Sequence, residues 1–354
     1  MTDEILDWFK IAQRDLPWRH DQSPYRIWLS EIILQQTRVK QGLPYYERFV
    51  KTFPNVYDLA RASEDEVLKL WQGLGYYSRA RNLHHTAKKV VNEHHGIFPK
   101  TYKELKKLRG IGDYTASAIA SICYGEPVAA LDGNVFRVLS RFLGIDIPIN
   151  STEGRKIFKE TAEIYLNKDR PGDYNQAIME FGATQCKPKK PLCQTCPLQK
   201  SCVAFQQERV DKLPVKLKKT KVRTRYFNYL IFLSSTGETL IQQRTQQDIW
   251  QKLYEFPLVE SSSPLSKSKL FHTEFIQNLT LNSYEIKRLN KKSIKHQLTH
   301  QQLWVRFWLI RAKDLPEMTS TKEKKTDRVP IGQLHRFPVP ALIAKFLQEF
   351  DFSG

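Results

Sequence analysis

The sequence contains no long apolar run. No stretch of its 354 residues approaches the roughly 18 uninterrupted apolar residues that a membrane-spanning helix needs, so no membrane span is expected. The first ten residues, MTDEILDWFK, are acidic and amphipathic, and they lack the basic start and apolar core of a secretory signal. We therefore expect a cytoplasmic, prokaryotic protein.

Acidic residues are scarce relative to basic ones. The chain has 37 Asp and Glu against 56 Lys and Arg, a formal net charge of +19. This excess favours a polyanionic partner, first nucleic acid and second a membrane surface, although a merely basic protein is the alternative. Together with the expected cytoplasmic location, it suggests association with the nucleoid. The length predicts about two domains, and we expect a monomer.

Residues 1–205 are predicted to be helical, with Pro and Gly between the helices and no internal repeat. Apolar residues recur at helical spacing in 4–12, 26–39, 64–71, 83–91, 115–122, 135–143, 157–166 and 174–181.

The second half of the chain has a different pattern. Residues 212–225 hold seven Lys or Arg in fourteen positions, which predicts an exposed linker that either contacts DNA phosphates or is simply solvated. Residues 226–354 are predicted to form an α+β domain. Its expected elements are a β-hairpin of 226–233 and 239–244, a strand over 303–310 and a closing helix over 341–350.

Four of the five cysteines lie within seventeen residues, with the spacing C-x6-C-x2-C-x5-C. They are Cys186, Cys193, Cys196 and Cys202. Four nearby lysines would stabilise thiolates, which favours a metal site over two disulfides. Spacing alone leaves zinc and a [4Fe–4S] cluster open. Cys123 lies apart, on an apolar helix, and is expected in the core.

A glycine pair lies between two predicted helices. In the segment 108–114, Gly110 and Gly112 allow a tight turn with exposed backbone N–H groups. With the N-terminus of the next helix, those groups can hold a phosphate without recognising base sequence. An ordinary turn between helices is the alternative interpretation.

Glu31 is a candidate general acid. If 30–37 is helical, Ile27, Trp28 and Leu34 share its face. Apolar surroundings raise the pKa of a carboxyl group, so that it can hold a proton near neutral pH. A surface glutamate is the alternative.

Asp132 is a candidate for the opposite role. It directly precedes a predicted helix that starts near Val135, so it is an N-cap candidate whose ionised form the helix amides would favour. A structural cap is the alternative. Paired with Glu31, it has the logic of glycosidic cleavage, in which an acid and a carboxylate flank an oxocarbenium-like sugar.

Several motifs together resemble the MutY family of adenine DNA glycosylases, within the helix-hairpin-helix (endonuclease III) superfamily. They are Pro17–Arg19, Ser30–Thr37, Gly73–Arg81, L-x-G-I-G-x-Y-T-A at 108–116, Leu131–Val135 and the four cysteines. The resemblance covers nearly all of residues 4–205. It implies a [4Fe–4S] cluster on Cys186, Cys193, Cys196 and Cys202.

The resemblance also implies a domain organisation. A helical glycosylase region would span 1–211, with a six-helix part at about 24–132 that contains the helix-hairpin-helix 105–122. A cluster part would combine 1–23 with 133–211. A basic linker, 212–225, and a Nudix-like lesion-recognition domain, 226–354, would follow.

The implied function is monofunctional removal of adenine mispaired with 8-oxoguanine or guanine in duplex DNA, in base excision repair. Glu31 matches the proton donor and Asp132 the transition-state stabiliser, while Asn134 and Tyr114 match supporting positions. Tyr114 stands where glycosylase/lyases carry a nucleophilic lysine. The resemblance therefore implies that the strand stays intact.

Other matches concern DNA. Gln36 and Tyr76 match residues that enter the stack around the oxidised guanine. Leu298-Thr299-His300 matches the family's Phe-Ser-His lesion motif, with Thr299 and His300 keeping a hydroxyl and an imidazole. Gln176 stands where relatives often have a glutamate.

One missing motif limits the function. The Nudix-like region lacks the glutamate-rich pyrophosphatase box, so nucleotide hydrolysis is not expected. A thymine or uracil mismatch glycosylase and a non-catalytic lesion-binding protein are the alternative functions.

The cysteine spacing generates the first prediction. We expect the purified protein to absorb visible light, as thiolate-bound iron–sulfur centres do and zinc–thiolate sites do not. An absorption spectrum with an iron determination on the same sample measures this. A colourless, zinc-loaded protein would contradict the cluster.

Overall fold

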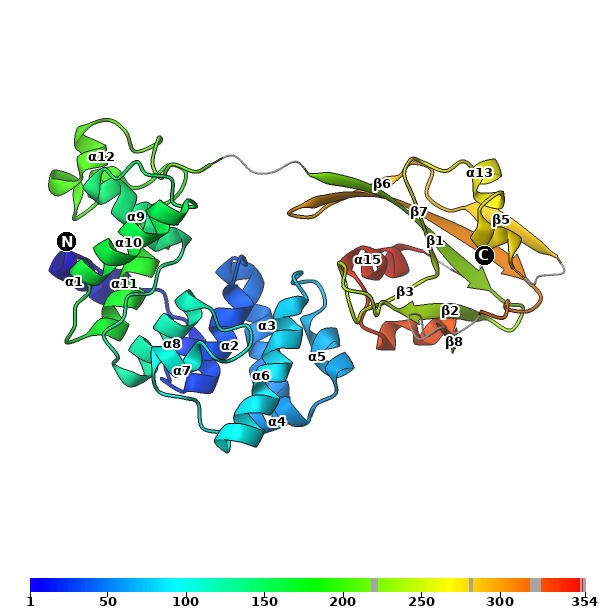
Figure 1. The fold of residues 1–354 in the computed structure, drawn as a ribbon, viewed down its shortest axis with the longest axis horizontal. Coiled ribbons are helices and arrows are strands. Elements are labelled where there is room, and N and C mark those ends of the chain that lie inside the picture. Colours follow the sequence, from blue (N-terminus) through cyan, green and yellow to red (C-terminus); the bar gives the residue numbers. More distant parts are fainter. Residues whose placement is uncertain (218–221, 280–282, 319–325, 351, 353–354) are drawn as a thin grey trace. The chain divides into compact units, whose positions relative to one another are not determined.

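The computed structural model describes residues 1–217, 222–279, 283–318, 326–350 and 352 (Figure 1). The chain forms two compact units. The first comprises Met1–Ala62 with Asn82–Lys218, and the second comprises Ser63–Arg81 with Lys219–Gly354. Residues 218–221 of the predicted linker lie outside the described residues.

The first unit is helical, as predicted. Its elements are α1 (Thr2–Ala12), η1 (Pro17–Arg19), α2 (Pro24–Leu34), α3 (Val39–Thr52), α4 (Val56–Arg61), most of α6 (Ser78–His94), α7 (Tyr102–Leu105), α8 (Asp113–Tyr124), α9 (Gly133–Leu143), α10 (Thr152–Tyr165), α11 (Pro171–Thr184), η2 (Cys193–Thr195), η3 (Gln199–Ser201) and α12 (Val203–Gln206).

Helix α11 organises the interior of this unit. It packs against α1, α8 and α9, and eight of its fourteen residues are buried. One apolar core joins α1, α9 and α11 to α10, with Ile5, Phe158 and Phe181 among its fully buried side chains. Burial of large apolar surface is what fixes the helices against one another.

The stretch 26–39, predicted as a single helix, forms the end of one helix and the start of another. Helix α2 ends at Leu34, and α3 begins at Val39. Gln36, between them, has φ of +55°, a left-handed conformation that an α-helix cannot contain. Helix α3 escaped prediction because Gly42 and Pro44 interrupt its apolar pattern.

The second unit contains two sheets and short helices. Its elements are α5 (Glu64–Trp71), β1 (Arg223–Leu233), β2 (Glu238–Gln243), β3 (Tyr254–Glu255), β4 (Leu258–Ser261), α13 (Lys267–Phe271), α14 (Glu274–Gln277), β5 (Tyr284–Arg288), β6 (Ile294–Gln297), β7 (Gln301–Ala312), β8 (Thr326–Pro330), η4 (Ile331–Arg336) and α15 (Ala341–Glu349). One sheet has the order β4-β1-β7-β5, with β6 also on β7, and the other has the order β3-β2-β8.

The predicted β-hairpin is wrong, although both of its strands exist. Strand β1 pairs in parallel with β7, from Arg223 opposite Gln301 to Leu233 opposite Arg311, whereas β2 lies in the other sheet. From Phe227 to Leu233 every residue of β1 is buried. A strand buried on both faces belongs in the centre of a sheet, which local alternation could not reveal. The strand over 303–310 and the closing helix are confirmed.

Among the described residues, no helix combines the length and apolar character that crossing a membrane requires.

Two helix ends generate a stability prediction. Gly125 and Gly144 follow α8 and α9 with φ of +69° and +70°. A Cβ at Gly125 would meet nothing within 4 Å, but at Gly144 it would lie 2.6 Å from Val203 Cγ1. We expect Gly125→Ala to destabilise the unit by about 1 kcal/mol through backbone strain alone, and Gly144→Ala to destabilise it more. Denaturant unfolding of the two variants measures this, and equal losses would contradict the packing argument.

Candidate active site

Helix α2 places Glu31 in an apolar wall. Pro24 starts the helix at a position where no N–H donor is needed, and Ile27, Trp28 and Ile33 are at most 2 % exposed. Glu31 is itself only partly exposed. The predicted helical face is therefore present around this carboxyl group.

Burial raises the pKa of Glu31 to about 7. A hydrogen bond from Tyr114 and the charge of Arg19 lower this pKa, while the charge of Asp132 raises it further. Burial is the largest of these effects, since a carboxylate in apolar surroundings loses its hydration. The group can therefore carry a proton at neutral pH.

Tyr114 lies in the first turn of α8, which starts at Asp113. Its hydroxyl lies 3.2 Å from the sulfur of Met179 and also interacts with Glu31. Burial raises the pKa of this phenol well above its ordinary value, and the charges of Glu31 and Asp132 add to the effect. Tyr114 is therefore a neutral hydrogen-bonding group here.

Asp132 caps helix α9. One carboxylate oxygen, Oδ1, accepts from the backbone N–H groups of Asn134 and Val135, both at 2.8 Å, and the other, Oδ2, accepts from Asn134 Nδ2 at 2.6 Å. The predicted N-cap is confirmed. These three hydrogen bonds fix the orientation of the carboxylate.

The electrostatics of Asp132 differ from the expectation. Burial raises the pKa of Asp132, and the bonds from Val135 and Asn134 and the charge of Arg137 lower it without outweighing burial. The helix amides favour the anion as predicted, but sequence could not reveal the burial that opposes them. Both candidate carboxyls are thus partly desolvated, and their charges interact.

The segment that leads into Asp132 is held by Asn175 of α11, which is 1 % exposed. Its Oδ1 accepts from the Ala130 backbone at 3.0 Å, and its Nδ2 donates to the Val128 carbonyl at 2.9 Å and to Ser121 Oγ at 2.8 Å. One buried amide thus joins α8, α11 and the approach to Asp132.

The glycine pair forms a hairpin between α7 and α8. Gly110 has φ of +82°, and a Cβ there would lie 2.7 Å from Asn82 Cβ, so this position requires glycine for two reasons. Gly112 is the N-cap of α8. The carbonyl of Arg109 accepts from Thr86 at 2.7 Å, which fastens the hairpin to α6. Its backbone N–H groups suit a phosphate.

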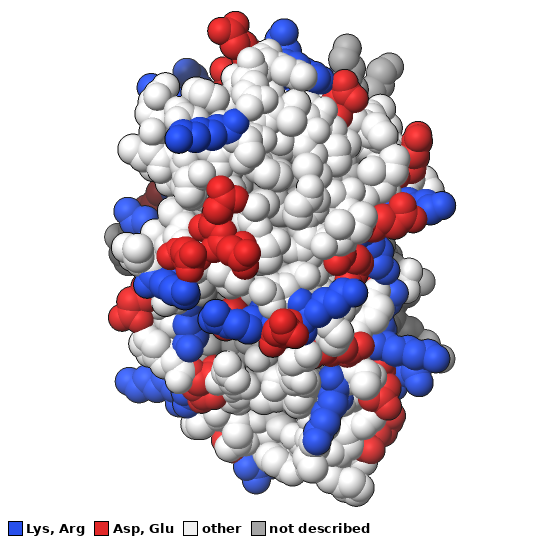
Figure 2. Space-filling view, turned by 90° about the vertical axis from the view of Figure 1, so that its left-hand side faces the viewer, with Lys and Arg blue, Asp and Glu red and all other residues white. Residues whose placement is uncertain are grey.

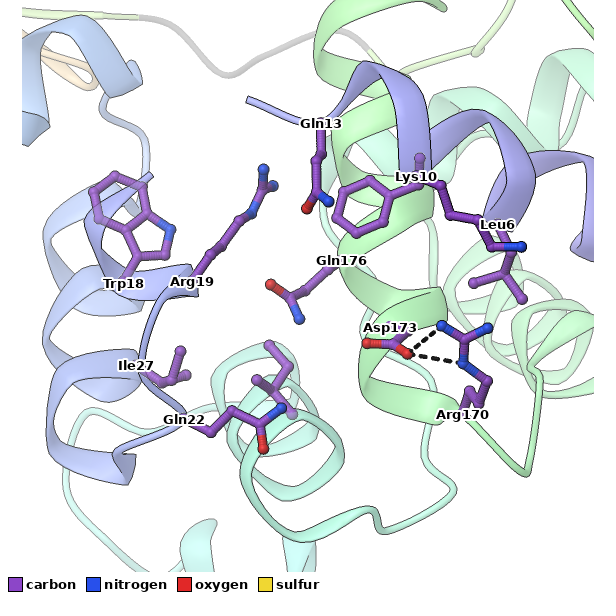
Figure 3. A pocket seen from close by; sticks show the side chains of 12 residues that line it. Leu6, Lys10, Gln13, Trp18, Arg19, Gln22, Ile27, Arg170, Asp173 and Gln176 are labelled. Carbon is purple, nitrogen blue, oxygen red and sulfur yellow. Dashed lines mark hydrogen bonds and ion pairs between the residues drawn. The ribbon is translucent and has the colours of Figure 1, made fainter. Parts of the chain in front are cut away.

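A cavity of about 190 Å³ lies beside α2 and α11 (Figure 3). Arg19, Gln13 and Gln176 point into it from η1, the loop before it and α11. Trp18 and Ile27 supply apolar walls. The cavity therefore offers a flat polar ligand both hydrogen bonds and apolar contact.

Family comparisons extend these observations. Residues 29–163 match the model described as HhH-GPD superfamily base excision DNA repair protein, and residues 228–349 match the NUDIX domain. An adenine DNA glycosylase of Buchnera aphidicola (Baizongia pistaciae) is 36% identical over 86% of this chain and 85% of its own length. Another, from Buchnera aphidicola (Schizaphis graminum), is 32% identical over 98% and 97%.

The chain belongs to the adenine DNA glycosylase family. It is thus a DNA glycosylase of base excision repair.

Solved structures agree with the fold. A thermostable thymine-DNA glycosylase matches with a TM-score of 0.54 at 30% identity, covering 58% of this chain and 95% of that one. A non-covalent endonuclease III–DNA complex matches with a TM-score of 0.51 at 22% identity, covering 58% and 94%. Both matches support the helical glycosylase fold of the first unit.

The cysteine loop follows α11. All four cysteines are free thiols of intermediate exposure. Burial raises the pKa of Cys196 to about 11, and the charges of the other three cysteines raise it as well, which shows that the four lie near one another. In the described part of the chain, no three His, Cys, Asp or Glu side chains gather as ligands of a single metal ion.

Two arginines of α9 connect the glycosylase site with this loop. Arg137 Nη2 donates to Asn134 Oδ1 at 2.8 Å, and its Nε donates to the Cys186 carbonyl at 2.8 Å. Arg141 Nη1 lies 3.5 Å from the Cys186 sulfur, and the Arg141 carbonyl accepts from Cys202 Sγ at 3.5 Å. The cap of Asp132 and the cysteine loop therefore share one hydrogen-bond network.

Sequence reasoning missed both arginines. Their i, i+4 spacing on the helix after Asp132 was the only available signal, and it fits a solvated face equally well. They are in fact buried, at 8 % and 2 % exposure. The cavity residues Gln13 and Gln22 gave no signal at all, because they lie outside any pattern.

Gln36 and Tyr76 share an unusual feature. Both are exposed, and both have left-handed backbones, with φ of +55° and +47°. Such strain in non-glycine residues often marks functional positions. In the second unit, the Tyr76 hydroxyl hydrogen-bonds to the Thr299 hydroxyl, so two residues predicted to contact the lesion meet there. His300, the residue after Thr299, is also exposed.

One face of the molecule carries charges of both signs. On the face drawn in Figure 2, Lys and Arg side chains are interspersed with Asp and Glu. That face therefore lacks the single-sign surface that a DNA backbone favours.

The raised pKa of Glu31 generates a pH prediction. A general acid must hold its proton, so base release should fall as pH rises through about 7, where Glu31 ionises. Single-turnover base release between mildly acidic and alkaline pH measures this. A rate that stays constant across neutrality would contradict the role of Glu31.

Proposed function

We propose that this enzyme hydrolyses the N-glycosidic bond of adenine paired with 8-oxoguanine, or with guanine, in duplex DNA and leaves the strand intact. The observation that carries this is the Glu31 carboxyl, whose pKa burial raises to about 7 next to Tyr114 and Asp132. An uncharged acid beside a second carboxylate is the arrangement that glycosidic cleavage requires.

Glu31 is proposed as the acid. Adenine is a poor leaving group as an anion, so a proton must reach one of its ring nitrogens before or while the bond to the sugar breaks. A carboxyl with a pKa near the working pH transfers that proton most effectively. Tyr114 supports Glu31 through its hydroxyl and, unlike a lysine, cannot form a Schiff base with the sugar.

Asp132 is proposed to stabilise the sugar cation. Departure of the neutral base leaves an oxocarbenium-like sugar, and the anion of Asp132 offsets its positive charge or bonds to it transiently. Asn134 holds this carboxylate through two hydrogen bonds, one from its backbone N–H to Oδ1 and one from its side-chain Nδ2 to Oδ2. A water molecule then adds at the anomeric carbon, loses a proton and completes hydrolysis.

The cavity beside α2 is the proposed site of the extruded base. The amide of Gln176 can donate to a ring nitrogen and accept from an amino group, which matches the alternating pattern on an edge of adenine. Arg19 adds a cationic donor on the facing wall. A glutamine can therefore serve where relatives often place a glutamate.

DNA contacts are proposed at positions that the sequence singled out. The amides near Gly110 and Gly112 would hold a phosphate, and Gln36 and Tyr76 would enter the base stack. Thr299 and His300 would hydrogen-bond to 8-oxoguanine. The hydrogen bond between Tyr76 and Thr299 supports a shared role for these two residues.

A [4Fe–4S] cluster is proposed on Cys186, Cys193, Cys196 and Cys202. A cluster takes one thiolate at each of four irons, and the four free cysteines of this loop, whose charges act on one another, supply that number of ligands. The cluster would tie the loop together, and Arg141 would donate toward the sulfur of one ligand. The domain boundaries given from sequence, with 226–354 as a lesion-recognition domain, are proposed with it.

A second candidate follows from one neighbour. The thymine-DNA glycosylase matches at 30% identity, so thymine is the alternative leaving base. Thymine lacks an amino group, but its N3–H and a flanking carbonyl can also pair with the amide of Gln176, so the identity of the released base distinguishes the two candidates.

The test uses Glu31→Gln, which keeps the shape of the side chain but removes its acidic proton. We expect wild type to release adenine from adenine:8-oxoguanine and adenine:guanine duplexes, with no thymine released from thymine:guanine. The variant should lose at least about 100-fold in single-turnover rate, since general acids contribute about that much or more, while its duplex affinity stays within a few-fold.

Strand integrity serves as the internal control. Wild type should leave an abasic site that breaks only on alkaline treatment. Direct strand cleavage would contradict the monofunctional assignment, and a wild type that releases thymine alone, or no base, would overturn the proposed substrate.

A further inference from the structure

Glu180 is a buried carboxylate that the mechanism above does not use. It lies on α11, one turn after Gln176, and is 2 % exposed. Its Oε1 accepts from Arg14 Nε at 2.5 Å, and its Oε2 accepts from Arg14 Nη2 and Arg19 Nη2, both at 2.8 Å. The backbone N–H of Arg14 also donates to Oε1 at 3.2 Å. Two arginines therefore share one carboxylate.

These contacts immobilise Arg19. Besides Glu180, its guanidinium donates through Nη1 to the Arg14 carbonyl at 2.8 Å and lies over the Phe9 ring, 5.2 Å from the ring centroid. The side chain is 13% exposed and borders the cavity. Phe9 also lines the cavity, whereas Glu180 and Arg14 do not, so the hydrogen bonds that fix Arg19 come from residues outside the cavity lining.

A purely structural role explains this arrangement poorly. Desolvating a carboxylate and two guanidiniums is unfavourable, and apolar side chains often stabilise such a site more. Apolar side chains could not hold a guanidinium in a fixed position at the border of the cavity, whereas these three charged groups do.

We propose that Glu180 is a positioning residue, which holds the Arg19 guanidinium where it contacts the extruded base and faces Glu31. This rests on the proposed function of the cavity as the base site. Glu180 does not itself line the cavity, so it acts through Arg19. The remaining N–H groups of Arg19 are then donors for an acceptor nitrogen of the base.

Charge interactions link Arg19 to the acid. The charged or titratable groups that act on Glu31 are Arg19 from η1, Tyr114 from α8 and Asp132 before α9, and Cys123 of α8 also interacts with it. Arg19 is the cation among them, and its charge lowers the pKa of Glu31. Moving Arg19 away should therefore let that pKa rise.

Glu180→Gln tests the proposal on the full-length protein with its cluster. We expect single-turnover adenine release at pH 7 to fall by about 10-fold to 100-fold, as a misplaced contact typically causes, with duplex affinity within about 2-fold. The alkaline limb of the rate should move to higher pH, because a displaced Arg19 no longer lowers the pKa of Glu31. The double variant with Arg19→Ala should be no slower than Arg19→Ala alone.

Two further variants complete the experiment. Glu160→Gln removes the same charge from an exposed position on α10, and should match wild type in rate and pH profile. Glu180→Asp keeps the charge but withdraws it from Arg19, so it should show the same limb shift even if Glu180→Gln fails to fold, as judged by thermal unfolding and cluster absorption.

Three outcomes would overturn the proposal: an unchanged alkaline limb, a limb that moves to lower pH because Arg19 stays in place with its charge uncompensated, or effects of Glu180 and Arg19 that add independently. Each outcome is judged by comparison with a wild-type enzyme that releases adenine. A wild type without adenine release would defeat the proposed function first, and this inference with it.

Discussion

The partial burial of one carboxyl group is the constraint on which the glycosylase site depends. The acid role proposed for Glu31 depends on the apolar surroundings that α2 provides, and α3 and α8 pack against α2. The close approach of α2 and α3 is visible at Gly42, where a Cβ would lie 2.7 Å from Leu34. Helix packing therefore sets the proton affinity of the acid.

Helix α11 carries much of the remaining organisation. It supplies Asn175, which holds the approach to Asp132, Gln176 at the cavity, and Glu180, which binds Arg19. Gly182, further along, lies against Asn134, and a Cβ there would come within 2.6 Å of Asn134 Cβ. A single buried helix thus fixes the cap, the base cavity and the start of the cysteine loop relative to one another within the first unit.

The hydrogen bonds of Arg137 connect the cysteine loop with the cap formed by Asp132. The guanidinium touches both Asn134 and the Cys186 carbonyl, so displacement of the loop reaches the group that orients Asp132. In the second unit, which matches the NUDIX domain over residues 228–349, Thr299 hydrogen-bonds to Tyr76. The Arg137 network thus belongs to the first unit, and the hydrogen bond between Tyr76 and Thr299 belongs to the second.

The sequence by itself determined the helical character of the first half, the cap at Asp132, the glycine hairpin and the family, because these depend on local spacing and on short motifs. Only the tertiary structure decided that β1 is a central strand beside β7 and that a helix ends before Gln36. It also decided that burial raises the pKa of Asp132 despite its cap, and that Glu180, Arg137 and Arg141 are buried. Desolvation and strand pairing join residues far apart in the chain, and no local pattern records them.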